Sequence, residues 1–116
     1  MQRKFRLTRS TDFKRVRRFG KSYAHPLVVL ITQPSDQLQI HVGVTAGKTV
    51  GNAVQRNRAK RLLRAAAQRL LPDLAPGFDL ILIARPPLTT STLDETCATL
   101  RLLLQRAGLL NSPNAA

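Results

Sequence analysis

Apolar residues along the chain follow two different spacings, and together these predict a mixed α and β protein. The apolar runs at 27–31 and 78–84 are continuous and rich in β-branched residues, which predicts strands buried on both faces. Strict alternation over 38–44 predicts a strand with one buried face, and 21–24 predicts a short strand. We expect the strands at 27–31 and 38–44 to pair as an antiparallel hairpin through a turn at 34–36.

Spacings of three and four predict three helices. The first covers 10–18 and begins at a hydroxyl residue that can cap it. The second covers 51–71 and is stopped by Pro72. The third begins at Thr92, which forms a capping box with Glu95. The element order αβββαβα predicts an α+β fold, a two-layer α-β sandwich with helices packed on a central four-stranded sheet.

The length of 116 residues suits one domain, 1–116, with a flexible basic arm over 1–9 and a flexible tail over 111–116. No run of eighteen apolar residues is present, so we expect no membrane span. The basic N-terminus lacks the apolar run of a secretory signal. Cys97 is the only cysteine and falls on the apolar stripe of the last helix, so we expect a buried, inert thiol in a reducing cytoplasm.

Charge points to the class of partner. The net charge is +13, from nineteen Lys and Arg against six Asp and Glu. Such a surplus makes a compact domain repel itself, and a bound polyanion offsets the repulsion. Sixteen of the nineteen basic residues lie in 1–69, and 37–72 contains no acid. We therefore expect a nucleic acid, with an anionic membrane surface or simple solubility as the weaker alternatives.

The long helix concentrates this charge on one face. At 100° per residue, its apolar positions form one side, and the opposite side carries a cationic stripe. The polar residues on or near that stripe are Arg56, Asn57, Lys60, Arg61 and Arg64. A charged outer face is common on surface helices, but here no acid interleaves to form stabilising i,i+4 pairs. Such a helix is suited to phosphates. Arg58 falls off the stripe, and of this group it is best suited to a structural role.

Few residues could support catalysis by the chain itself. His25 and His41 are the only histidines, and His41 sits on the polar side of its strand, where it either lines a cleft or lies on solvated surface. Six scattered acids offer no paired carboxylates for two-metal chemistry. We therefore expect no catalytic residue and no metal site in the protein.

The long helix also carries a specific motif. The matching residues are Lys48, Gly51-Asn52-Ala53-Val54, Arg56-Asn57-Arg58, Lys60-Arg61 and Arg64. This pattern closely resembles the arginine–asparagine–arginine motif of the bacterial ribonuclease P protein family. The resemblance extends over nearly the whole chain, including Arg6-Leu7, Asp12-Phe13, 42–44 and 79–85.

The resemblance implies a fold and a function. It implies a left-handed β-α-β crossover, which reverses the right-handed default. It also implies a subunit of an endoribonuclease in which a partner RNA, with Mg²⁺, removes the 5′ leader of precursor tRNA and the protein alone is not catalytic. The RNA-binding residues that we expect are Lys48, Asn52, Arg56, Asn57, Arg58, Lys60, Arg61 and Arg64. We expect no obligate protein partner.

The leader is expected in a cleft between the first helix and the sheet. Phe13 matches a leader-contacting aromatic of the family, although packing in the core is an equal alternative for it. Many relatives carry a second aromatic one turn later, where this chain has Arg17, whose guanidinium can also stack on a base. Lys14 extends the cationic track, and His41 is the remaining residue expected at this cleft.

Two other functions stay open at this point. A ribosomal protein or an RNA chaperone would share the charge but not the long motif. A self-sufficient nuclease is disfavoured because the chain has so few acids. Cleavage of precursor tRNA with and without the catalytic RNA separates all three.

Overall fold

A computed structural model of the chain describes residues 3–110, and the tail predicted at 111–116 lies outside the described residues. Its helices and strands are α1 (Ser10–Phe19), β1 (Lys21–Ala24), β2 (Val28–Pro34), β3 (His41–Thr45), α2 (Ala53–Leu70), β4 (Phe78–Ala84) and α3 (Leu93–Arg106). Short 3-10 turns occur at Arg3–Phe5, Lys48–Val50, Leu71–Asp73 and Pro86–Thr90. The predicted order αβββαβα is therefore confirmed.

The four strands form one mixed sheet in the order β1-β2-β4-β3. β2 pairs antiparallel with both β1 and β4, and β3 pairs parallel with β4. The predicted hairpin of the second and third strands is therefore wrong, because β4 lies between them. β4 is nearly all apolar and suits a central place with both faces covered, whereas β3 has three half-buried positions and suits an edge.

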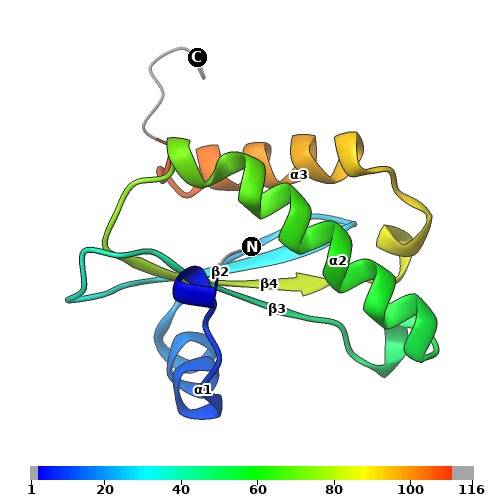
Figure 1. Ribbon diagram of the computed structural model, residues 1–116, viewed down its shortest axis with the longest axis horizontal. Coiled ribbons are helices and arrows are strands. Elements are labelled where there is room, and N and C mark those ends of the chain that lie inside the picture. Colours follow the sequence, from blue (N-terminus) through cyan, green and yellow to red (C-terminus); the bar gives the residue numbers. More distant parts are fainter. Residues whose placement is uncertain (1–2, 111–116) are drawn as a thin grey trace.

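Helices cover both faces of this sheet. α2 and α3 lie together on one face, and α1 crosses the other (Figure 1). The parallel connection from β3 to β4 runs through α2, as expected for a β-α-β crossover. Its handedness stays a prediction. The predicted two-layer arrangement is present where α2 and α3 pack on one face of the sheet, and α1 covers the opposite face.

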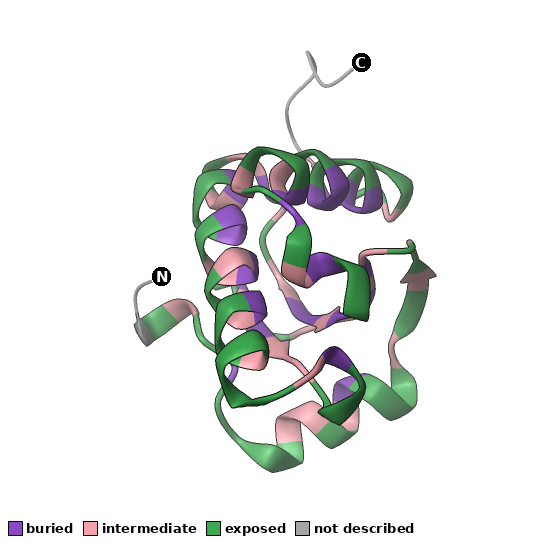
Figure 2. Cartoon of the chain, turned by 90° about the vertical axis from the view of Figure 1, so that its right-hand side faces the viewer, coloured by how far each residue is buried: buried purple, intermediate pink, exposed green. Residues whose placement is uncertain are grey.

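Alternation along the strands produces two apolar clusters. On the larger face, Leu30, Leu80 and Leu82 pack against α2 and α3 residues such as Leu63 and Leu103. Buried positions gather on the sides of those helices that face the sheet (Figure 2). The smaller cluster under α1 contains Leu7, Val16, Ile31 and Ile81. The first helix is thus held by few side chains, and polar contacts matter more for its position.

α1 differs from its prediction at the start. The capping position is Arg9, and no side chain caps the helix there, so the predicted hydroxyl cap is wrong. Its end at Gly20 is confirmed. Gly20 is needed for close packing, since a Cβ there would stand 2.6 Å from Cγ2 of Ile31 and would overlap the carbonyl oxygen of Val16.

The segment before α1 is anchored, contrary to the flexible arm expected over 1–9. The Leu7 side chain is only 7% exposed, and the Leu7 N–H donates to the carbonyl oxygen of Val42 at 2.9 Å. An apolar residue inside a basic stretch supplies the anchor, and this also covers part of the open edge of β3.

Both long helices begin as predicted or within two residues of it. Asn52 caps α2, and its side chain and that of Gln55 form a reciprocal capping box. Thr92 and Glu95 form the predicted box at α3. Cys97 on α3 is half-buried rather than fully buried, and Nη1 of Arg69 lies 3.8 Å from its Sγ.

Candidate RNA-binding surface

The cationic stripe of α2 contains Arg56, Lys60 and Arg64, which follow one another at intervals of about one helical turn. All three residues are half-buried. Within residues 3–110, the acids form ion pairs with Arg15, His41 and Arg69, and with no residue of this stripe. The predicted row of unpaired cations on one helix is therefore present.

Arg64 is the member of the stripe whose surroundings are best defined. Burial and the nearby positive charge of Arg6 lower the pKa of the Arg64 guanidinium from its ordinary value. A guanidinium keeps its proton under all ordinary conditions, so the residue remains charged. The lowered pKa means that this charge is held in an unfavourable place, without a carboxylate to compensate it.

The opposite flank of α2 is used for structure. The Arg58 Nε–H donates to the carbonyl oxygen of Thr89 at 3.1 Å, which ties α2 to the 3-10 turn before α3. Nη1 of Arg69 lies 3.2 Å from Oδ1 of Asp94 on α3. Arg58 thus has the structural role suggested by its angle on the helix. Arg61 and Asn57 are both exposed and lie on the helix between the stripe and this flank.

Two expected RNA-binding residues lie at the start of α2. Lys48 is exposed on the 3-10 turn that leads into the helix, where it extends the cationic surface. The Asn52 side chain is instead occupied, because its Oδ1 accepts the Gln55 N–H at 2.9 Å. Asn52 therefore caps α2 and satisfies a helix N–H that would otherwise be unpaired, and we expect this role to outweigh the predicted contact with RNA, which stays a prediction.

A cleft opens beside Arg64. It is lined by Arg6, Leu7, Thr8, Phe13, Val42, Val44 and Arg64. Phe13 is half-buried: it packs against the smaller core cluster and also contributes to the cleft wall, so core packing is confirmed in part and contact with the leader stays a prediction. Its ring lies over Gly43, where an added Cβ would stand 2.7 Å from ring atom Cε1.

Sequence reasoning missed two residues here. Gly43 allows the ring of Phe13 to approach β3, and a glycine inside a strand was the available signal. Arg6 enters the cleft because Leu7 anchors the segment, which charge alone could not indicate. Lys14 and Arg17 are exposed on α1 but do not line this cleft, so the structure does not gather them with Phe13.

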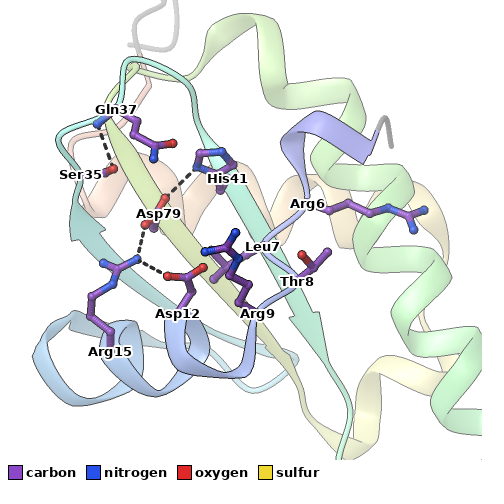
Figure 3. A pocket seen from close by; sticks show the side chains of 10 residues that line it. All are labelled: Arg6, Leu7, Thr8, Arg9, Asp12, Arg15, Ser35, Gln37, His41 and Asp79. Carbon is purple, nitrogen blue, oxygen red and sulfur yellow. Dashed lines mark hydrogen bonds and ion pairs between the residues drawn. The ribbon is translucent and has the colours of Figure 1, made fainter.

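His41 lies in a second, polar pocket. It lines this pocket with Arg9, Asp12, Arg15 and Asp79, and the segment 6–8 borders both this pocket and the cleft beside Phe13 (Figure 3). Its Nδ1 is 3.1 Å from Oδ1 of Asp79. His41 therefore lines a pocket between α1 and the sheet but does not line the cleft that contains Phe13, and its contact with the leader stays a prediction.

Asp79 organises this second pocket. It is only 4% exposed, and its Oδ2 lies 2.6 Å from Nη2 of Arg15. The hydrogen bond to Asp79 raises the pKa of the Arg15 guanidinium. Arg15 also donates to the side chain of Gln33. These contacts tie α1 to β2, β3 and β4, and thereby fix the helix that carries Phe13.

Other kinds of site are not apparent in residues 3–110. No three His, Cys, Asp or Glu side chains in this range gather to hold a metal ion. No helix among the described residues is both long and apolar enough to cross a membrane.

An α+β fold with a cationic helix beside an aromatic cleft is that of a small RNA-binding protein. Residues 1–108 match the family model of Ribonuclease P. The ribonuclease P protein component of Oceanobacillus iheyensis is 35% identical, and the match covers 97% of this chain and 93% of that relative.

Solved structures agree with this match. The ribonuclease P protein of Staphylococcus aureus superposes with a TM-score of 0.82 at 29% identity, covering 92% of this chain and 98% of that one. The protein from Thermotoga maritima gives a TM-score of 0.78 at 26% identity, covering 87% and 96%. The chain belongs to the ribonuclease P protein family, and it is a subunit of an RNA-catalysed endoribonuclease that removes the 5′ leader of precursor tRNA.

Proposed function

We propose that the two surfaces divide the work of the subunit between the catalytic RNA and its substrate. The stripe of α2, with Arg56 and Lys60 at its centre, binds the sugar–phosphate backbone of the ribonuclease P RNA. The cleft beside Phe13 binds the single-stranded 5′ leader of precursor tRNA. The observation that carries this proposal is the acid-free row of half-buried cations next to an aromatic cleft.

The cationic stripe of α2 is suited to phosphates because its side chains do not have to break an ion pair with a described acid when RNA binds. An arginine that is already paired must give up that contact to bind RNA, as Arg69 would. Arg56 and Lys60 have no such cost among the described residues. Arg56 can fork onto two phosphate oxygens, and Lys60 acts as a compact point charge. Lys48 and the exposed Arg61 extend the same surface.

The cleft suits a nucleoside because it combines apolar side chains with the two cations Arg6 and Arg64. Phe13 presents a ring and Val44 on β3 supplies aliphatic surface, whereas Val42 is only 2% exposed. Single-stranded RNA is commonly held by base stacking along a basic groove. In this proposal Arg17 and Lys14 steer the strand from the exposed side of α1.

Mg²⁺ is proposed to reside on the RNA. The described acids do not fit a metal site, since no three potential ligands gather and the two Asp79 oxygens already contact Arg15 and His41. The cations of the protein lower the repulsion between RNA phosphates, which favours the fold that holds the ion. The partners in this proposal are the catalytic RNA and precursor tRNA, in the cytoplasm, with no obligate protein partner and no membrane.

The test compares precursor tRNA with mature tRNA as ligands of the reconstituted RNA–protein complex. Wild-type protein should favour the precursor, and Phe13→Ala should lose about ten-fold in affinity for the precursor only, since stacking contributes about 1–3 kcal/mol per base. Phe19→Ala is the matched control, because Phe19 is also on α1 but is 67% exposed and outside the cleft. Equal preference for the precursor in Phe13→Ala and wild type would contradict the cleft assignment.

A further inference from the structure

Arg6 and Arg64 enter one cleft from two different elements. Arg6 belongs to the anchored segment before α1, and Arg64 belongs to the fourth turn of α2. Arg6 also borders the pocket of Asp79, and Figure 3 shows its side chain extending from that segment toward α2. Within the part of the chain that the structure describes, neither guanidinium pairs with an acid.

Two neighbouring cations without an acid are unfavourable in the free protein. The lowered pKa of Arg64, caused by burial and by the charge of Arg6, reports that repulsion. The anchor at Leu7 prevents the segment from simply moving away, because the Leu7 side chain is buried and its N–H is bonded to β3. An anion placed between the two arginines would relieve the repulsion and receive two forked donors.

The surroundings select the kind of anion. Besides the two arginines, the cleft is lined by apolar side chains, of which Val44 and Phe13 are half-buried and can present surface to a ligand. A free inorganic anion would leave that apolar surface uncovered. A nucleotide matches both parts, since its phosphate meets the arginines and its sugar and base cover the ring and Val44.

We propose that Arg6 and Arg64 clamp one phosphate of the single-stranded leader, with the adjoining nucleoside against Phe13. This deepens the proposed function and rests on it. It changes the role of Arg64, which then contacts the substrate, while Arg56 and Lys60 on the same stripe contact the catalytic RNA. The two surfaces therefore meet at Arg64 and form one continuous track.

The experiment neutralises one leader phosphate at a time. Precursor tRNAs that carry a single uncharged methylphosphonate at successive leader linkages are bound to the reconstituted complex, with protein in excess so that assembly is complete. Arg6→Ala should weaken binding of the unmodified precursor about ten-fold, as expected for a hydrogen bond to a charged group. At one linkage, the methylphosphonate should cause a similar loss in wild type and no further loss in Arg6→Ala.

Arg64→Ala should couple to that same linkage, and this coincidence is the signature of a clamp. Arg101→Ala is the matched control, because Arg101 is exposed on α3 and lies outside the cleft. It should leave affinity unchanged at every linkage. Arg6→Lys should retain part of the affinity, since lysine keeps the charge but lacks the fork.

Two results would overturn the clamp. In one, losses from the variant and from the methylphosphonate add at every linkage. In the other, Arg6 and Arg64 couple to different linkages. Either result leaves the cleft assignment intact provided that Phe13→Ala still abolishes the preference for precursor tRNA. If wild type itself showed no such preference, the proposed function and the clamp would both fail.

Discussion

The ring of Phe13 lies over Gly43 and occupies the space that a side chain at position 43 would need. Phe13 is on α1 and Gly43 is on β3, so this contact joins the first helix to the edge strand. It sets how far α1 stands above the sheet, and therefore the depth of the cleft lined by Val42 and Val44.

Gly43→Ala should displace the ring of Phe13. Overpacking of this kind costs about 1–3 kcal/mol of unfolding free energy, and the affinity for precursor tRNA should fall with it. Urea unfolding and binding to the reconstituted complex measure the two effects. Gly47→Ala is the control, since nothing lies within 4 Å of a Cβ at position 47 and it should change neither quantity. A fully stable Gly43→Ala protein would contradict the contact.

Asp79→Asn should destabilise the protein by about 1–3 kcal/mol, because it leaves Arg15 facing a neutral amide at a position only 4% exposed. Asp94→Asn provides the comparison. The Asp94 side chain is 92% exposed and its pair with Arg69 contributes little, so its removal should cost less than about 1 kcal/mol. Thermal or urea unfolding distinguishes the two, and equal losses would argue against Asp79 as the anchor of α1.

Asn52→Ala should cost about 1 kcal/mol of stability through loss of the α2 cap. At protein concentrations where the variant is folded, its RNA affinity should remain near that of wild type. Ser10→Ala serves as control, because the capping position of α1 is Arg9 and carries no side-chain cap. If Asn52→Ala lost RNA affinity at unchanged stability, Asn52 would be a binding residue after all.

The sequence predicted those features that depend on local spacing. The stripe of α2 follows from a repeat of 3.6 residues, and the start of α3 follows from the capping box of Thr92 with Glu95, whereas the similar box at Asn52 was not predicted. These interactions span three or four residues, so their signal is contained in a short stretch of chain.

Features that depend on distant pairing could not be predicted in this way. The spacing of apolar residues does not indicate which strands pair with each other, so the place of β4 between β2 and β3 was not predicted. Asp79 and Arg15 are sixty-four positions apart, and nothing in either local pattern indicates the pair. The contact between His41 and Asp79 was missed for the same reason, since the two residues become neighbours only through the parallel pairing of β3 with β4.

The central claim is that the unpaired cations of α2 bind the backbone of the catalytic RNA, and the salt dependence of assembly tests it most directly. Affinity for the ribonuclease P RNA should be measured across a range of salt for wild type, Arg56→Ala, Lys60→Ala and the control Arg69→Ala. Each α2-stripe substitution should lower the slope of log affinity against log salt by about 0.7–0.9, because one phosphate contact is lost. Arg69→Ala should keep the wild-type slope, since Arg69 is paired with Asp94. Wild-type affinity and slope in both Arg56→Ala and Lys60→Ala would contradict the account.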